Sequence, residues 1–166
     1  MLTCEGQQGP VEEGQTKKRT PTVRLQTFRR CYTEILKGED PWIPLGMFMH
    51  QFFGMYKHLR SQLVRDPIRV PEDVSPEQFR WAVFCAASVE YLCKKYEIEC
   101  PAWVFSPSYT LEKPWYYDIN ADLAEVQEEL RQNTPEEFSR RNIFCGNRVF
   151  NNKYEHKGRQ GRRTAA

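Results

Sequence analysis

The sequence predicts a mainly α-helical protein: a small helical bundle with a central buried helix and an ordered loop rich in proline and aromatic residues. Three segments lead to this prediction. Residues 75–99 are apolar on nearly every side, as is typical of a buried helix. Residues 44–63 place apolar side chains three or four positions apart, the spacing of an amphipathic helix. Residues 101–117 combine prolines with large aromatic rings, which indicates an ordered irregular segment.

The central helix has a clear start signal. Ser75 is a good N-cap, Pro76 suits the first helical position, and Gln78 completes a capping box. Pro101 prevents the helix from continuing much beyond Cys100. We expect the core to centre on this helix and on the helix over 44–63. The side chains expected to be nearly buried are Phe79, Val83, Phe84, Ala87, Leu92, Phe52, Tyr56 and Leu59.

Shorter elements are expected on either side. Thr20-Pro21 predicts the start of a first helix, which Gly38 ends. The pattern predicts a further helix over 121–132 and a short one over 135–140, with Phe138 pointing inward. Ile143-Phe144 and Val149-Phe150 form either a small hairpin or two apolar contacts of an irregular end.

The aromatic loop has two interpretations. In the first it is structural, with Trp103 and Trp115 packed against the helices. In the second its rings form a platform for a ligand such as nucleotide bases. Only Lys113 supplies a positive charge among these rings, which favours the structural interpretation.

The chain of 166 residues suits one domain. Residues 1–19 are polar and predict a disordered arm. Residues 20–152 form the predicted single helical domain, and residues 153–166 a basic disordered tail. That tail carries five Lys or Arg and one Glu, a net charge of about +4. The tail, together with Arg24, Arg29 and Arg30, is a candidate contact for nucleic acid; a solvated end is the competing interpretation.

We expect a cytoplasmic protein. The N-terminus lacks an apolar secretory signal, and the longest apolar run, residues 81–87, is too short to span a bilayer, so no membrane partner is expected. The cysteines are accordingly expected to be free thiols. They are Cys4, Cys31, Cys85, Cys93, Cys100 and Cys145.

The sequence predicts no catalysis, cofactor or metal. It contains no nucleophile elbow, phosphate-binding loop, dinucleotide fingerprint or zincin motif. There is no C-x-x-C, and the three histidines do not have the spacing of zinc ligands relative to the cysteines. Acidic residues near the aromatic loop fit helix caps and solubilising groups better than a catalytic set.

A partner-binding surface is predicted instead. Three methionines between residues 47 and 55 give the helix over 44–63 an adaptable apolar character, although methionines also fill cores. Two arginines near the C-terminal end can form charged hydrogen bonds with an acidic partner. The candidate partner-binding residues are Trp42, Met47, Phe53, Met55, Arg140 and Arg141.

Three motifs carry a family resemblance. They are Pro101-Ala102-Trp103, Leu111-x-x-Pro114-Trp115-Tyr116 and Thr134-Pro135-x-x-Phe138-x-x-Arg141-x-Ile143-Phe144. In this order they resemble a family of small uncharacterised bacterial proteins associated with toxin–antitoxin-like or mobile-element neighbourhoods. The resemblance covers roughly residues 75–150, and Tyr116 stands where that family has Phe.

The resemblance implies a non-enzymatic, antitoxin-like protein that binds a bacterial toxin, with a nucleotidyltransferase-type protein as one candidate. The alternative is a nucleic-acid-associated accessory protein of a mobile element. Salt dependence separates the two, because binding to phosphates weakens strongly with added salt and an apolar complex does not.

Overall fold

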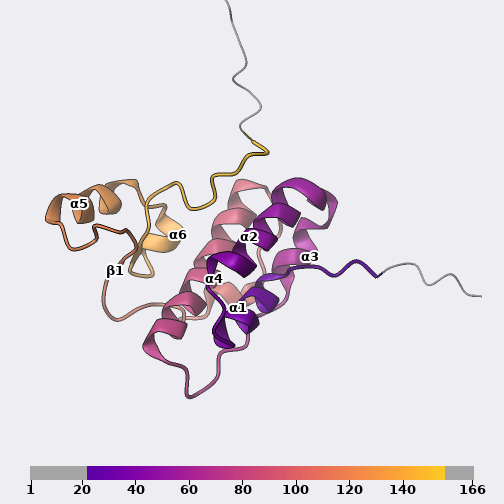
Figure 1. Cartoon of the computed structure of the whole chain (residues 1–166), viewed down its shortest axis with the longest axis horizontal. Coiled ribbons are helices and arrows are strands. Elements are labelled where there is room, and N and C mark those ends of the chain that lie inside the picture. Colours follow the sequence, from indigo (N-terminus) through magenta and orange to yellow (C-terminus); the bar gives the residue numbers. More distant parts are fainter. Residues whose placement is uncertain (1–21, 156–166) are drawn as a thin grey trace, which may run out of the picture.

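The computed structural model describes residues 22–155, and these form a mainly helical fold. Helix α4 (Pro76–Lys95) is the longest element, and residues 81–90 along it are all buried. Helix α1 (Phe28–Leu36), η3 (Ala102–Phe105) and α6 (Glu136–Ser139) pack against it, while α2 (Trp42–His50) packs on α1. Figure 1 shows α4 behind α1 and α2, so the predicted mainly α fold with a central buried helix is confirmed.

The start of α4 is the predicted one. The Ser75 side chain accepts a hydrogen bond from the Gln78 backbone N–H, and the Gln78 side chain accepts one from the Ser75 N–H. The helix ends at Lys95, before the expected position near Cys100. Glu97 adopts a positive φ of 54°, which turns the chain back so that the Ile98 N–H bonds the Cys93 carbonyl. This turn ends the helix before Pro101 becomes a constraint.

Helix α1 begins later than predicted. The structure begins this helix at Phe28 because Thr27 caps it, its side chain accepting from the Arg30 N–H. Residues 22–26 have no regular secondary structure, and the Gln26 backbone N–H is bonded to the Gln51 side chain at 2.7 Å. The predicted stop at Gly38 is confirmed, since Gly38 has a φ of 95° and its N–H bonds the Ile35 carbonyl.

The single helix predicted over residues 44–63 is wrong. The chain instead forms α2, a π-helical turn η1 (Gln51–Met55), a 3-10 turn η2 (Lys57–Leu59) and α3 (Arg60–Arg65). The carbonyl of Phe52 accepts a hydrogen bond from Arg60 Nε at 2.9 Å, and this contact stabilises the break. Phe52 remains fully buried, whereas Tyr56 and Leu59 are only half-buried.

The segment after α4 is ordered and follows the structural interpretation. Strand β1 (Trp115–Tyr116) pairs in parallel with β2 (Ile143–Phe144), with Trp115 opposite Ile143. The hairpin considered between residues 143–144 and 149–150 is therefore not formed. Helix α5 (Ala124–Asn133) begins three residues later than predicted and projects to one side of the molecule in Figure 1.

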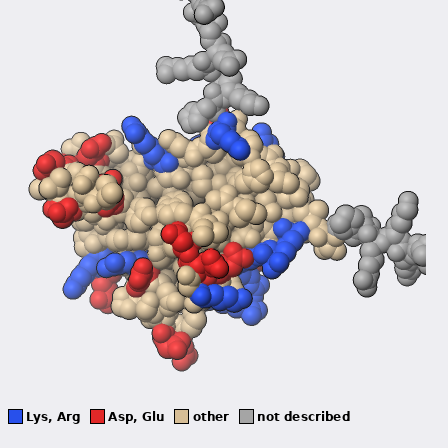
Figure 2. Space-filling model, viewed as in Figure 1, with Lys and Arg blue, Asp and Glu red and all other residues tan. Residues whose placement is uncertain are grey.

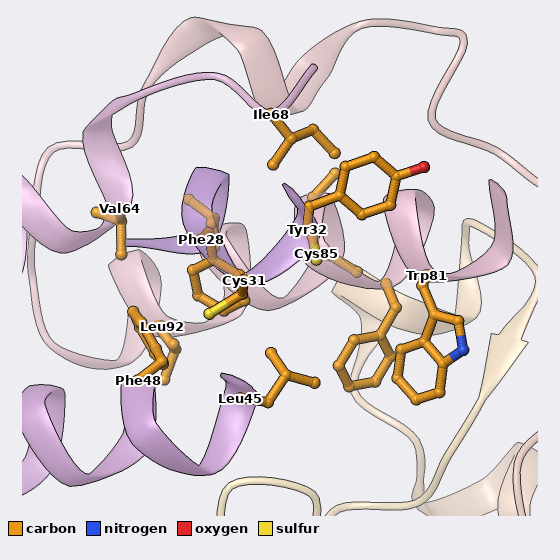
Figure 3. Packing of buried hydrophobic residues seen from close by; sticks show 14 of the residues in the cluster. Phe28, Cys31, Tyr32, Leu45, Phe48, Val64, Ile68, Trp81, Cys85 and Leu92 are labelled. Carbon is orange, nitrogen blue, oxygen red and sulfur yellow. The ribbon is translucent and has the colours of Figure 1, made fainter. Parts of the chain in front are cut away.

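The core joins α1, α2 and α4. Figure 3 shows Phe28, Phe48 and Leu45 meeting the side chains of α4, among them Cys85 and Leu92. Fully burying each large apolar side chain contributes about 1.5–3 kcal/mol. Of the predicted core, Val83, Phe84, Ala87 and Leu92 are buried and Phe79 is half-buried. Phe138 of α6 is also buried, as predicted.

Both ends of the chain continue beyond the described part. The predicted disordered arm, residues 1–19, lies outside the described residues, as do residues 156–166 of the predicted basic tail. Lys153, Tyr154 and Glu155 are described and form a turn. The ring of Tyr154 lies where a side chain at Gly54 would be, and Glu155 accepts a hydrogen bond from the Tyr96 hydroxyl.

Candidate protein-binding surface

One side of α2 and η1 is apolar and open to solvent. Residues 41–56 contain no Asp, Glu, Lys or Arg. Leu45, Phe48 and Phe52 are fully buried, so they form the inner side of these helices. The exposed residues recur one turn apart on the outer side. They form what we call the α2 face: Ile43, Gly46, Met47, His50 and Met55.

The exposure of the α2 face is unusual for side chains of this kind. Ile43 is 59% exposed, and Met47 and Met55 are each 52% exposed. Figure 2 shows an uncharged surface over α2, with charged side chains gathered around it. Single exposed apolar residues are ordinary, but a contiguous group with a polar rim is typical of a protein interaction site.

Gly46 adds a flat place to the α2 face. A Cβ atom at this position would meet no other atom within 4 Å, so the helix backbone itself is open to solvent between Ile43 and Met47. Glycine costs an exposed helix about 1 kcal/mol relative to alanine. Because Gly46 has no side chain, the backbone of another molecule can come close to this helix.

The α2 face is bounded by the turn at residues 153–155. The ring of Tyr154 lies against Gly54, where there is no side chain, and its hydroxyl bonds His50 Nδ1. The tyrosine therefore covers the end of the face next to η1, while Ile43, Gly46 and Met47 stay uncovered.

The two aromatic residues predicted as partner contacts, Trp42 and Phe53, differ in their burial. Trp42 is half-buried, its Nε1–H donates to the Tyr117 hydroxyl, and its ring lies edge-on to Trp81 and Phe84. Its ring thus belongs largely to the core at the entrance of α2. Phe53 is only 1% exposed, so its prediction as a partner contact is wrong. The π-helical turn directs it against Phe52 and Tyr96.

The prediction for the second arginine is also wrong. Arg141 is 4% exposed, and its guanidinium donates to Glu90 at 2.6 Å, to the Glu137 carbonyl at 2.7 Å and to the Val104 carbonyl at 2.8 Å. Every one of these partners belongs to the chain itself, so Arg141 is a structural residue. Arg140 reaches the same Glu90 carboxylate, but its side chain is 42% exposed.

Sequence reasoning missed Ile43, the most exposed large side chain of the α2 face. The helix predicted over residues 44–63 leaves Ile43 outside it. Helix α2 begins at Trp42, which puts Ile43 one turn before Met47. The absence of charge from Pro41 to Tyr56 was the available signal, because a solvent-facing helix normally carries charged residues.

A second surface is cationic. Arg24, Arg29, Arg30 and Lys37 lie around a shallow cavity of about 300 Å³ at α1. Glu34 partly offsets this charge, since Arg30 Nε lies 2.9 Å from its carboxylate. Arg24, Arg29 and Arg30 are thus brought together as the nucleic-acid interpretation expects.

The positions of the histidines and cysteines within residues 22–155 bear on metal binding and on nucleophilic chemistry. His50 and His58 are exposed, and the part of the chain from 22 to 155 contains no group of His, Cys, Asp or Glu arranged to hold a metal ion. Burial raises the pKa of the Cys31 and Cys145 thiols to about 12, which opposes their use as nucleophiles. No helix within residues 22–155 has both the length and the apolar character needed to cross a membrane.

Comparisons of the chain with protein-family models, with curated proteins and with solved structures find no match. The motif resemblance therefore stays a prediction. Several positions of the three motifs have structural contacts here: Trp115 and Ile143 pair in the sheet, Phe138 is buried, and Arg141 is bonded to Glu90. The α2 face and the cationic surface at α1 are therefore the candidate functional features.

Proposed function

We propose that this chain is a non-enzymatic protein-binding module and that the α2 face is its binding surface. The observation that carries the proposal is the exposure of Ile43 and Met47 on a helix without any charged residue. Burying such side chains in a complex removes apolar area from water at roughly 25 cal/mol per Å². Flexible methionine side chains also adapt to the shape of a partner.

The occupant we propose is an apolar helix of another protein. Gly46 gives such a helix a place of close approach, and Ile43 and Met47 form apolar contacts on either side of it. Arg140, the predicted arginine that remains exposed, directly follows α6 and lines a pocket with residues 104–110, away from the α2 face. Binding at the α2 face alone should therefore depend weakly on salt.

The finer proposal is that the partner is a bacterial toxin, with a nucleotidyltransferase-type protein as one candidate, and that the chain acts as its antitoxin in the cytoplasm. Its support is the motif resemblance and the availability of a surface for stoichiometric masking. A masking protein needs only a stable complex, so the proposed α2 face is sufficient without any catalytic residue.

The test is coexpression with a toxin candidate encoded beside this chain. Complex formation is measured by size-exclusion chromatography with light scattering, and function by growth rescue. I43D and M47D should abolish both while leaving the melting temperature within a few degrees. Ile119→Asp is the matched control, because Ile119 is an apolar residue that is 95% exposed on the segment before α5.

Two results would count against the proposal. A complex that survives both substitutions would reject the α2 face as the binding surface. Absence of any complex with the candidate would reject the antitoxin role.

The cationic surface at α1 supports a second candidate, binding of nucleic acid. Arg24, Arg29 and Lys37 are exposed or half-exposed and outnumber the single acidic residue of that cavity. R29Q with K37Q should weaken binding to a fluorescent single-stranded oligonucleotide, and the dependence of log K on log salt should become shallower. Salt-independent binding, or none at 50 mM salt, would reject this candidate.

A further inference from the structure

A small pocket lies between the aromatic loop and α6. Its cavity volume is about 360 Å³, and no acidic side chain lines it. Phe105 and Pro107 form an apolar wall, Ser106 and Thr110 supply hydroxyl groups, and Arg140 lies at the pocket. Concave sites of at least about 300 Å³ with a few converging polar groups are typical of small-ligand binding.

Buried Arg141 fixes the loop that forms one wall of the pocket. The Arg141 guanidinium donates to the Val104 carbonyl at 2.8 Å, and the Arg141 carbonyl accepts from the Leu111 N–H at 3.1 Å. Both ends of the loop over residues 104–111 are therefore attached to Arg141. Asn142 adds a bond from its side chain to the Leu111 carbonyl at 2.6 Å. A wall fixed in this way needs little ordering when a ligand enters.

The charge at the pocket is positive. Arg140 and Arg141 both donate to the Glu90 carboxylate, so two guanidinium groups share one negative charge. Arg141 makes two further bonds within the chain, to the Glu137 and Val104 carbonyls, whereas the Arg140 side chain is 42% exposed. A guanidinium group has five N–H donors, and within residues 22–155 the Arg140 guanidinium makes one bond, to Glu90. The free donors of Arg140 suit an oxyanion.

An aromatic or aliphatic group would find contacts beside that charge. Phe105 is 55% exposed, an unusual position for a ring whose neighbour Val104 is fully buried. Tyr109 adds a second ring to the lining, supported from behind by an edge-on contact with Trp103 at 5.8 Å between ring centroids. Charge and apolar surface thus lie next to each other in one cavity.

We propose that this pocket binds an oxyanion, carboxylate or phosphate, attached directly to an aromatic or aliphatic group. Arg140 binds the oxyanion, the Ser106 and Thr110 hydroxyls donate further hydrogen bonds to it, and Phe105 contacts the apolar group. Arg141 is a positioning residue that holds the loop. This site is separate from the α2 face and does not depend on the protein-binding proposal.

Titration followed by ¹H–¹⁵N correlation spectra of the full chain tests the proposal. The probes are phenyl phosphate and N-acetyl-L-phenylalanine, which carry the ring with a phosphate or a carboxylate. N-acetyl-L-phenylalanine amide is the neutral control, and inorganic phosphate is the control without a ring. At least one of the two charged aromatic probes should shift the amide signals of residues 105–110 in a saturable manner. The probe that binds more tightly identifies the oxyanion as phosphate or carboxylate.

Variants locate the site. R140Q should weaken binding about tenfold or more, since it removes a charge-assisted contact. F105A should weaken the aromatic probes and leave inorganic phosphate unchanged. R131Q is the matched control: Arg131 is also ion-paired and 48% exposed, but on α5, and its loss should change nothing.

Three results would overturn the proposal. They are equal binding of the amide and the acid, equal weakening by R131Q and R140Q, and no shift of residues 105–110 at 20 mM of either charged aromatic probe. If R140Q loses its dispersed spectrum and is therefore unfolded, R140K is used in its place. R140K keeps the positive charge and should retain part of the affinity for the charged probes.

Discussion

Arg141 and Glu90, 51 residues apart in the sequence, meet in the interior with 2.6 Å between Arg141 Nη1 and the Glu90 carboxylate. The pair connects the segment after α6 to the middle of α4. Arg140 contacts the same carboxylate from the solvent side. Two adjacent arginines therefore share one partner but differ in burial, and their substitutions should have different effects.

R141Q should lower the free energy of unfolding by about 2–4 kcal/mol, because it removes the buried bond to Glu90 and leaves the Glu137 and Val104 carbonyls without this donor, while Arg140 still pairs with Glu90. R140Q should cost about 1 kcal/mol or less, as is usual for an exposed ion pair. Urea unfolding at pH 7, followed by circular dichroism, measures both. Equal losses would contradict the assignment of Arg141 as the structural member of the pair.

Gly54 and Tyr154 provide a second prediction. A Cβ atom at position 54 would lie 2.5 Å from Tyr154 Cζ, whereas a Cβ atom at Gly46 would meet nothing. Gly46→Ala should therefore raise the free energy of unfolding by up to about 1 kcal/mol. Gly54→Ala should give a smaller gain or a loss, because it displaces the tyrosine ring.

The same pair of substitutions in a Tyr154→Ala background serves as the control. Without the ring, Gly54→Ala and Gly46→Ala should have similar effects on the free energy of unfolding. If the two already agree in the unmodified chain, Tyr154 does not lie against Gly54 in solution.

The lowered pKa of Glu137 should make the free energy of unfolding depend on pH. Burial acts to raise the pKa of this carboxyl, but Lys94, whose Nζ lies 2.9 Å away, and a backbone hydrogen bond outweigh it, so the pKa falls below 4.5. A group with a lowered pKa in the folded state binds protons more readily when unfolded. Its stabilisation is present above about pH 4.5 and is lost as the pH falls through the lower folded-state value.

We therefore expect the free energy of unfolding to decrease as the pH drops from 5 to 3, with a shallower decrease in E137Q. Thermal melts at half-unit pH intervals measure the two slopes. E128Q is a suitable control, since Glu128 belongs to an exposed pair on α5. Identical slopes for the unmodified chain and E137Q would show that Glu137 does not carry this dependence.

The cysteines should react slowly in the folded chain. Burial raises the pKa of Cys31, Cys93 and Cys145 to about 12 and raises that of the fully buried Cys85, so few thiolates exist at pH 7.5. Cys100 is half-buried and should label first among these five with iodoacetamide. Peptide mass spectrometry over time measures the order. Rapid labelling of Cys31 without denaturant would contradict the packing of α1.

The structure also bears on the predicted state of the thiols. All five cysteines in residues 22–155 are free, as the sequence predicts for that part of the chain. Cys4 lies outside the described residues.

Structural features that depend on residues close together in the chain can be predicted from the sequence alone. The capping box of Ser75 and Gln78, the stop at Gly38 and the apolar character of α4 each depend on residues a few positions apart. Such signals act whatever the rest of the chain does, because capping and backbone conformation are properties of a short segment. The mainly helical class and the central helix followed from them.

Contacts between groups far apart in the sequence are a property of the tertiary structure. Arg60 reaches the Phe52 carbonyl at the break after α2, and periodicity over 44–63 contains no information about that bond. The parallel pairing of Trp115 with Ile143 likewise requires two segments to be brought together by the packing of α4 and α6.

The accessibility of the candidate site residues is likewise a property of the tertiary structure. Arg140 and Arg141 are adjacent and chemically identical, and the sequence predicts both as partner contacts. Both guanidinium groups contact Glu90, but the packing of α6 on α4 buries that of Arg141 and leaves the Arg140 side chain 42% exposed. Burial is a property of the assembled helices, so no local pattern distinguishes the two arginines.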